Sequence, residues 1–524
     1  MRFNFTTDVV ERLARERPRD EALRALSSDG ERQSFTFAEV AQASAGAATS
    51  LSRRGVHPGD VVLTMMGSRP EWVFTMLAAW RLGAVALPCS EQLRRHDLAV
   101  RLTAARPALA VLAGDHVAEF EAAVRSCQHD TPHIDVDSES LVLDEAAHGA
   151  GTTVNDPALI VFTSGSAGEP RGALHTQRYL RGQTTQAEHW LGARPGDLVW
   201  CTAASGWSKS ARNSFVAAWT RGAACLLHDA RFDPAERLAL VAREEVNVLC
   251  SAPTEYRMIA KRTALDGLDV PSLRRLVSAG EPLNPEVIES FRQALDLEIH
   301  DGYGQTETGQ LTGVQTGDEV RPGSMGRPLP GFDLRVLDHE GQAADEGELC
   351  LDPASVPTFF RGYLDEPPFG ERIWRTGDRV RRDEAGYLWF EGRTDDVIVS
   401  AGYRIGPFEV ESALVEHPAV AEAAAIAAPD PERGSVVRAV VVLRDGQRGD
   451  EALVRELQDH VKQTTAPYKY PRIVEFRDAL PKTSSGKIKR AALRNESPRA
   501  RASGTTGSPD APEARHQPRD RRVR

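Results

Sequence analysis

The sequence is poor in cysteine, and no two cysteines stand in a C-x-x-C pair. Its six cysteines are scattered along 524 residues at Cys89, Cys127, Cys201, Cys225, Cys250 and Cys350. This scatter does not match a disulfide framework, which needs cysteines at regular spacing, or a zinc site, which needs close pairs. We therefore expect reduced thiols that pack in the core.

Long apolar runs and an excess of positive charge are also missing. The chain has no uninterrupted apolar stretch of about 18 residues, the length that spans a bilayer, and its first residues lack the apolar region of a signal peptide. We therefore expect no membrane span and a cytoplasmic location. The formal net charge of −11 argues against a nucleic-acid partner, because such a protein needs a basic face.

A chain of this length is expected to form two or three domains. Residues 1–394 are predicted to form a large α/β domain with parallel sheets, which includes a small β-rich subdomain at about 320–394. Residues 395–496 are predicted to form a small α+β domain. Residues 497–524 are rich in Arg, Pro, Gly and Ser without periodicity, and we expect them to be disordered.

The most regular pattern lies between Val246 and Glu307. Three short apolar runs, at 246–250, 273–280 and 297–304, alternate with two helical patterns. The second helix is predicted from Asn284 as its N-cap, with Pro285 in its first turn. Ligands bind beyond the carboxyl ends of parallel strands, so we expect the loops SAP, AGEPL and GYGQTETG to line one crevice.

The segment TSGSAGEPRG, residues 163–172, directly follows the apolar run 158–162. Small residues let the backbone approach a ligand closely, and successive N–H groups, hydroxyls and an arginine suit a phosphate. The spacing is not that of a Walker loop. Taken alone, the segment is also compatible with a flexible surface loop. If it holds a phosphate, it belongs in the same crevice as the loops above.

Six segments in order resemble the acyl-adenylate-forming superfamily, which includes acyl-CoA synthetases, adenylation domains and luciferases. The resemblance runs from about residue 30 to 495, and the C-terminal segments look most like medium-chain acyl-CoA synthetases. It implies that a carboxylic acid and ATP give an acyl-adenylate and pyrophosphate, after which the CoA thiol displaces AMP. The segments are TSGSAGEPRG, AGEPL, DGYGQTETG, WRTGDRV, GRTDDVIVSAGYRIGPFEVE and PKTSSGKI.

The resemblance assigns most ATP contacts to three segments. The first would surround the β- and γ-phosphates, but Arg171 stands where the family usually has lysine and Ser166 where it often has threonine. Arginine keeps the charge but is bulkier. The predicted ATP-binding residues of these segments are Thr163, Ser164, Gly165, Ser166, Ala167, Gly168, Glu169, Pro170, Arg171, Gly280, Glu281, Pro282, Gly302, Tyr303, Gly304, Gln305, Thr306 and Glu307.

Within these segments, Glu307 would ligate Mg²⁺ and Thr306 would hydrogen-bond the α-phosphate. Carboxylate oxygen suits a hard cation, although a glutamate in a first helical turn is also favoured by the helix dipole. Tyr303 would stack on adenine, with Gly280, Glu281 and Pro282 along the other edges of the base. Outside this context Tyr303 would be ordinary packing.

Downstream, the resemblance places Asp378 on the ribose hydroxyls, with Arg393 beside the same ribose. An ionised carboxylate is an acceptor with two oxygens, which suits two hydroxyls. The alternatives are a turn residue for Asp378 and a surface ion pair for Arg393. Asp395 matches the hinge of the small domain, although an acidic turn is its plain reading and the pair with Asp396 leaves the bending residue open.

The small domain would present two faces in turn. Lys487 matches the catalytic lysine that reaches the carboxylate and the α-phosphate, although most single lysines are merely solvated. The other face would bind CoA: Gly402 would let the pantetheine arm pass close to the backbone, and arginines would contact the CoA phosphates. Exposed arginines are common, so the assignments of Arg433 and Arg472 are weaker. The predicted CoA-binding residues are Ala401, Gly402, Tyr403, Arg404, Arg433, Tyr470, Pro471 and Arg472.

The acyl pocket would involve Trp207 and Lys209 in the segment SGWSKS. A core tryptophan and a solvent-pointing lysine are the respective alternatives. A charge at the mouth of the pocket disfavours long aliphatic chains, so we expect a short- to medium-chain or aromatic acid. Two other functions stay open at this point: loading of a carrier-protein thiol, and non-catalytic sensing of an acyl-adenylate or CoA. A homo-oligomer is also possible.

Overall fold

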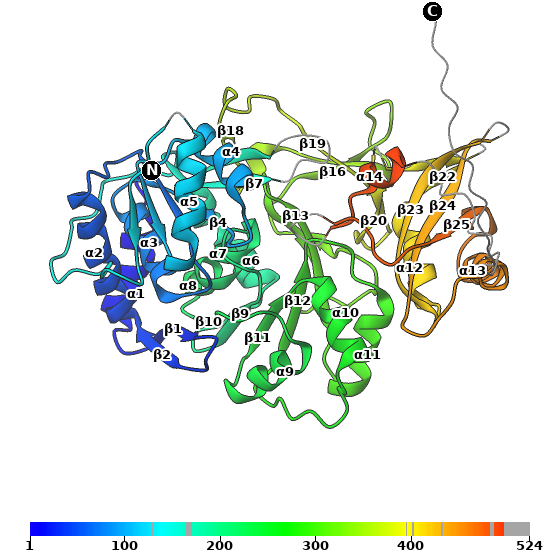
Figure 1. Ribbon diagram of the computed structural model, residues 1–524, viewed down its shortest axis with the longest axis horizontal. Coiled ribbons are helices and arrows are strands. Elements are labelled where there is room, and N and C mark those ends of the chain that lie inside the picture. Colours follow the sequence, from blue (N-terminus) through cyan, green and yellow to red (C-terminus); the bar gives the residue numbers. More distant parts are fainter. Residues whose placement is uncertain are drawn as a thin grey trace, which may run out of the picture.

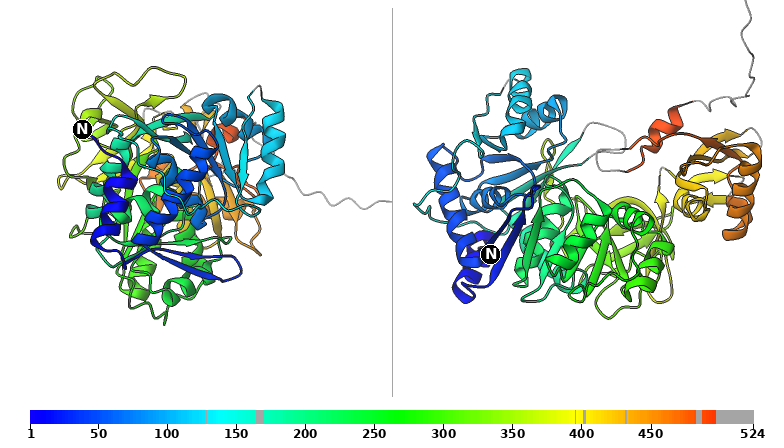
Figure 2. Two further views of the ribbon diagram at one scale, coloured as in Figure 1. Left: turned by 90° about the vertical axis from the view of Figure 1, so that its left-hand side faces the viewer. Right: turned by 60° about the horizontal axis from the view of Figure 1, so that its bottom comes forward.

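The computed structural model describes residues 1–127, 129–163, 170–394, 396–400, 403–430, 433–482 and 487–496. Strands and helices alternate through most of the chain, and a smaller lobe that begins near α12 (Pro407–Glu416) lies at one end of the molecule (Figure 1). The right-hand view of Figure 2 shows the same separation, with the N-terminal elements at the opposite end. An α/β fold with a large N-terminal and a small C-terminal domain is confirmed. The domain boundaries at 394 and 496 stay predictions.

The first large sheet has nine strands, and its central strands are parallel, as the alternating pattern predicts. β11, β12 and β13 pair in parallel, and β11 also pairs with β9. In spatial order the strands are β15 (Arg327–Pro328), β14 (Gly309–Gly313), β13 (Ile299–Gln305), β12 (Arg275–Ala279), β11 (Val248–Ser251), β9 (Leu198–Cys201), β10 (Ala224–His228), β1 (Glu21–Leu26) and β2 (Arg32–Thr36).

The second large sheet has seven strands and carries the segment 163–172 at one of its hairpins. Its buried strand β7 pairs antiparallel with β8, and Thr163 pairs with Arg171 at the end of the two strands next to the connecting segment. In spatial order the strands are β18 (Gly362–Tyr363), β8 (Arg171–Thr176), β7 (Pro157–Thr163), β4 (Val85–Cys89), β3 (Val61–Met65), β5 (Leu109–Leu112) and β6 (His133–Asp135).

Helices cover these sheets with apolar faces. In α2 (Phe37–Arg53) the sequence sets the start of the helix, and in α11 (Pro285–Leu295) it sets the buried face. α2 begins with a capping box in which Thr36 and Glu39 satisfy each other's backbone N–H groups. α11 buries Val287, Ile288 and Phe291 against its sheet, as its periodicity predicts. The other helices of this region are α1 (Glu11–Glu16), α3 (Pro70–Arg81), α4 (Arg95–Ala105), α5 (Gly114–Ser126), α6 (Gln177–His189), α7 (Ser208–Ala211), α8 (Ala217–Thr220), α9 (Pro234–Arg243) and α10 (Pro253–Arg262).

The β-rich segment forms a four-stranded antiparallel sheet in which β16 pairs with β17 and β19 pairs with β20, as the predicted hairpins require. The small lobe has its own core around β23, β24 and α13. The bounds are β16 (Leu334–Leu337), β17 (Glu346–Leu351), β19 (Trp374–Arg382), β20 (Leu388–Arg393), β21 (Ile398–Ser400), β22 (Tyr403–Ile405), β23 (Val420–Asp430), β24 (Gly434–Leu443), α13 (Glu451–Thr464), β25 (Ile473–Phe476) and α14 (Arg490–Asn495).

One sequence expectation is wrong in detail. GYGQ is not a loop: it continues β13, which turns within three residues into the antiparallel strand β14. Pairing with β14 supplies hydrogen-bond partners that a sequence pattern does not reveal. Asn284 occupies the N-cap of α11 and Pro285 follows it, as predicted; the Asn284 side chain makes no cap hydrogen bond and contacts Arg257 and Ser412.

Among the described residues, no helix is long and apolar enough to cross a membrane. Five of the six cysteines are buried, as expected of core packing, and Cys127 is partly exposed.

Candidate functional site

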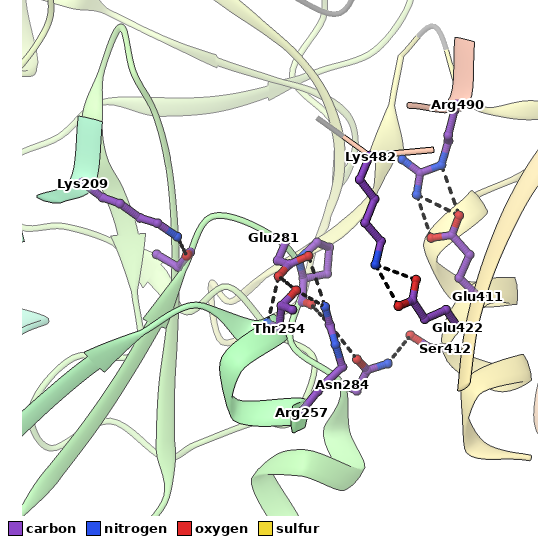
Figure 3. A network of polar contacts seen from close by, with 12 residues as sticks. Lys209, Thr254, Arg257, Glu281, Asn284, Glu411, Ser412, Glu422, Lys482 and Arg490 are labelled. Carbon is purple, nitrogen blue, oxygen red and sulfur yellow. Dashed lines mark hydrogen bonds and ion pairs between the residues drawn. The ribbon is translucent and has the colours of Figure 1, made fainter. Parts of the chain in front are cut away.

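The loop after β12 is held in place by α10. Glu281 accepts hydrogen bonds from the Thr254 backbone N–H at 2.8 Å and from the Thr254 hydroxyl, and Arg257 pairs with its other oxygen at 3.2 Å (Figure 3). Burial acts to raise the pKa of Glu281, but Arg257 and Thr254 together hold it below its usual value. The Glu281 side chain is therefore an ionised support for the loop, and its backbone and that of Gly280 are left to face a ligand.

A second support for this loop comes from Asp301, which the sequence reasoning missed. Asp301 is buried in β13, and the nearby backbone N–H groups of Leu283 and Gly302 act to lower the pKa of its carboxyl. Burial raises the pKa of this carboxyl well above its usual range. Its place at the carboxyl end of a parallel strand, directly before GYG, was the available sequence signal.

A dense polar cluster joins β13 to the β-rich sheet. The Tyr303 hydroxyl donates to Asp378, Gln305 Nε2 donates to the same carboxyl oxygen at 2.9 Å, and Arg393 donates to the other oxygen at 3.0 Å. Only 5% of Asp378 is exposed. Burial raises the pKa of Asp378, and the Arg393 guanidinium offsets part of that rise. Three predicted residues from two segments thus surround one carboxyl.

Glu307 and Arg171 are joined through a tyrosine that the sequence reasoning did not single out. The Tyr363 hydroxyl donates to Glu307 Oε1 at 2.7 Å, and the Arg171 guanidinium lies 3.5 Å from the centre of the Tyr363 ring. Arg171 also pairs with Glu366. This contact brings the hairpin of the second sheet next to the β13–β14 turn, so the two predicted phosphate-binding segments do meet. No spacing rule would have found Tyr363, because the contact crosses two sheets.

Several predicted residues lie outside the described part of the chain, and their places stay predictions. They are Ser164, Gly165, Ser166, Ala167, Gly168, Glu169, Asp395, Ala401 and Gly402. Thr163 and Pro170 flank the first of these gaps, and Thr306 lies in the β13–β14 turn.

Lys487 reaches the crevice from the small lobe. Its ammonium group lies near Lys209, Glu281, Asp378 and Arg393, although the residue keeps solvent access. Burial lowers the pKa of Lys487, and Lys209 lowers it further, whereas Glu281 and Asp378 act in the opposite direction. The structure therefore brings together the predicted catalytic lysine and the residues predicted to hold the nucleotide.

The segment 205–210 lies against the loop after β12. Lys209 Nζ donates to the Ala279 carbonyl at 2.9 Å, so this lysine points inward and the solvent-pointing alternative is wrong. Trp207 is partly exposed at the N-cap of α7, which argues against a core tryptophan. Gly206 has φ +88°, and a Cβ there would lie 2.2 Å from the Ser90 nitrogen, so a glycine is needed for the loop to approach β4.

The residues predicted to contact CoA lie on the small lobe. Tyr403 in β22 is 53% exposed and stacks on Tyr468 with ring centres 4.3 Å apart. The Arg472 guanidinium lies over the Tyr470 ring, 5.0 Å from its centre, and Pro471 lies between the two residues in the chain. Arg433 is exposed directly before the first residue of β24, and Arg404 belongs to β22. Exposed aromatic rings beside cations can bind a nucleotide or a pantetheine arm.

The sequence and the fold are similar to those of known proteins. The model for "AMP-binding enzyme" matches residues 10–364, and the model for "AMP-binding enzyme C-terminal domain" matches residues 409–487. An uncharacterized acyl-CoA ligase of Bacillus subtilis, YtcI, is 39% identical over 491 residues, covering 90% of this chain and 92% of that protein. The human mitochondrial acyl-coenzyme A synthetase ACSM4 is 39% identical, covering 95% and 91%. A benzoate CoA ligase from Burkholderia xenovorans LB400 has a similar structure, with a TM-score of 0.82, 28% identity and coverage of 94% and 100%.

Proposed function

The chain belongs to the AMP-binding enzyme family and is an AMP-forming acid–thiol ligase, and we propose that both of its half-reactions use the crevice between β13, the loop after β12 and Lys487. It activates a carboxylic acid with ATP to an acyl-adenylate and pyrophosphate, and the CoA thiol then takes the acyl group and releases AMP. The observation that carries the proposal is Lys487, which extends from the small lobe toward Glu281 and Asp378.

The nucleoside half of ATP is assigned to the Asp378 cluster. The Asp378 carboxyl accepts the two ribose hydroxyls, and Arg393 orients it and opposes the rise of its pKa. Tyr303 offers its ring to adenine, while its hydroxyl bond to Asp378 fixes the plane of that ring. The backbone of Gly280, Glu281 and Pro282 lines the remaining edge of the base, and α10 holds it in place.

The phosphates are assigned to the segment 163–171 and to Arg171. Arg171 already pairs with Glu366, so a phosphate must replace that carboxylate to bind the guanidinium. Stacking on Tyr363 holds the guanidinium plane during the exchange and limits the loss of side-chain entropy. Thr306 lies in the turn beside Glu307 and is placed to hydrogen-bond the α-phosphate.

Magnesium fits Glu307 as a partner shared with the phosphates. Among the described residues, no group of three or more His, Cys, Asp or Glu side chains could hold a metal alone. A lone carboxylate with phosphate oxygens and water is the usual Mg²⁺ environment in such enzymes. Glu307 would hold the ion, Tyr363 would orient the carboxylate through Oε1, and the ion would neutralise phosphate charge.

In the first half-reaction the acid carboxylate attacks the α-phosphorus and pyrophosphate leaves. Negative charge builds on the α-phosphate oxygens, and the Lys487 ammonium group stabilises it from the small lobe. Glu281 and Asp378 offset the influence of Lys209 on this lysine, which helps to keep it charged. The second half-reaction requires the small lobe to turn about Asp395 and present Gly402 and its neighbours to CoA.

For the acid we propose a short- to medium-chain or aromatic carboxylic acid that contacts Trp207 and Lys209. The test is a panel of acids with ATP and CoA, read by AMP release, with acids from acetate to palmitate, together with benzoate. Strong preference for palmitate over hexanoate and benzoate would contradict this acid class. Release of AMP that requires a phosphopantetheinyl carrier instead of CoA would contradict the acceptor.

A further inference from the structure

A small cavity with a few polar groups in a mainly apolar lining lies beside the acyl-pocket segment. It has a volume of about 30 Å³ and lies at the carboxyl ends of β9 and β11. That volume holds a water molecule or a substituent of similar size, but not an alkyl chain. Its lining includes Thr202, Lys209, Asn213, Ser251, Glu255 and Ala279.

Lys209 joins this cavity to the loop that we assign to the nucleotide. It lines the cavity, and its Nζ donates to the Ala279 carbonyl at 2.9 Å. The same nitrogen lies 2.7 Å from the position that a Cβ on Gly280 would occupy. Lys209 therefore lies between the cavity and the loop that we assign to the nucleotide.

The chemistry of the cavity is set by Glu255. Its Oε2 accepts hydrogen bonds from Thr202 Oγ1 at 2.5 Å and from the Ser251 hydroxyl. Its Oε1 lies 3.8 Å from Arg237, beyond hydrogen-bond distance. A donor that enters the cavity can therefore bond to Glu255 Oε1, and the Lys209 ammonium group can donate to an acceptor on the same substituent.

A helix-end role would explain Glu255 only in part. The residue lies in the first turn of α10, where the helix dipole favours a carboxylate. That role does not require two hydroxyls around the carboxylate or an inward-pointing ammonium group on the same cavity. An acid with a matching polar substituent uses all of these groups.

Resting on the proposed function, we propose that this cavity determines specificity and that the preferred acid carries a small hydrogen-bond donor, a hydroxyl or an amino group, which binds Glu255. A substrate that lacks the donor leaves Glu255 Oε1 without a hydrogen bond. Sites built to bond a substrate hydroxyl reject such analogues more strongly than an apolar pocket rejects a missing methylene.

The experiment compares matched acids that differ by one substituent. The pairs are benzoate against its three hydroxy and three amino isomers, and hexanoate against 6-hydroxyhexanoate, with kcat/KM from AMP release. We expect at least one substituted acid to exceed its parent by about 10–100-fold, the range for a hydrogen bond to a charged group. Glu255→Leu should abolish that preference while it keeps or improves turnover of the parent acid.

Glu121→Leu on the exposed face of α5 is the matched control, and it should leave the preference unchanged. Thr202→Val tests the same cavity if Glu255→Leu fails to fold, and melting temperatures separate the two cases. The proposal is overturned if every parent acid exceeds its substituted partners, or if a folded Glu255→Leu or Thr202→Val lowers both members of a pair equally. Absence of AMP release with all acids would instead overturn the proposed function.

Discussion

The Asp378 cluster and the contact between the two lobes differ sharply in how they are held together. In the cluster, Tyr303, Gln305 and Arg393 all donate to one carboxyl that is 5% exposed. Across the lobes, Asn284 Nδ2 donates to Ser412 Oγ at 3.3 Å (Figure 3), and a hollow of about 500 Å³ separates α10 and α11 from α12 and β24.

Four charged residues and several small or apolar ones line the hollow between the lobes. Lys261 and Glu286 face it from the large lobe, and Glu416 and Arg444 face it from the small lobe. Burial raises the pKa of Glu286, and the like charge of Glu416 raises it further. The proposed nucleotide half of the site is thus preformed within the large lobe, whereas the position of Lys487 depends on how the small lobe is held against it.

The largest effect is expected from Lys487→Ala. It should lower acyl-adenylate formation by about 10²–10³-fold, because one preorganised charge is removed from the transition state. The same variant, given synthetic acyl-adenylate and CoA, should form thioester at close to the wild-type rate. The exposed Lys489→Ala is the matched control. Equal loss of both half-reactions in a folded protein would contradict the division of labour between the lobes.

Gly402→Leu should have the opposite effect. Adenylation should be intact, and thioester formation should fall by about 10²-fold, the cost of a small displacement of the reacting atoms. The physical reason is that a leucine side chain blocks the thiol's path. Separate assays of the two half-reactions check this. Circular dichroism and thermal melts show whether the small lobe still folds, and loss of adenylation by a folded variant would count against the assignment.

Glu307→Gln tests the proposed magnesium partner in the large lobe. The amide keeps the size of the side chain but removes one negative charge from the metal's partners, so kcat/KM should fall by about tenfold or more at ordinary Mg²⁺. Higher Mg²⁺ should restore part of the activity. A titration of adenylation rate against Mg²⁺ is the measurement, and wild-type behaviour at ordinary Mg²⁺ would remove Glu307 from the site.

Lys209→Met should change the pH dependence of adenylation. Lys487 acts as an ammonium group and its pKa is lowered, so adenylation should fall with rising pH earlier than for an ordinary lysine. Removal of the Lys209 charge raises the pKa of Lys487 and should move the alkaline limb of the adenylation profile to higher pH. The midpoint is read independently of any change in maximal rate. A midpoint that stays in place or moves down would show that Lys209 does not influence Lys487.

Ser412→Ala should give the smallest effect. Loss of one hydrogen bond between the lobes is worth about 0.5–1.5 kcal/mol, so the fraction of molecules with Lys487 in the crevice should fall a few-fold. The ratio of adenylation to thioester rates should fall with it. Thr464→Ala on α13 is a control in the same lobe. An unchanged ratio would mean that this hydrogen bond does not bias the position of the lobe.

The local elements could be predicted from the sequence, and most candidate residues could be chosen from it, although their roles stay predictions. Thr36 and Glu39 specify the start of α2, and the apolar spacing of α11 specifies its buried face, because caps and periodicity act over a few residues. The alternation of strands and helices was enough to predict a parallel sheet. The order of short motifs was enough to predict the family.

Only the tertiary structure determined which residues support the site. The Tyr363 bond to Glu307 crosses two sheets, the Arg257 bond to Glu281 joins an α10 side chain to the loop after β12, and the place of Lys209 under Ala279 depends on the path of two loops. Such contacts join positions that are distant in the chain, so no local spacing records them. Glu255 shows this most clearly: in the sequence it is a first-turn helix carboxylate, and only the packing of β9 against β11 turns it into the polar wall of a cavity.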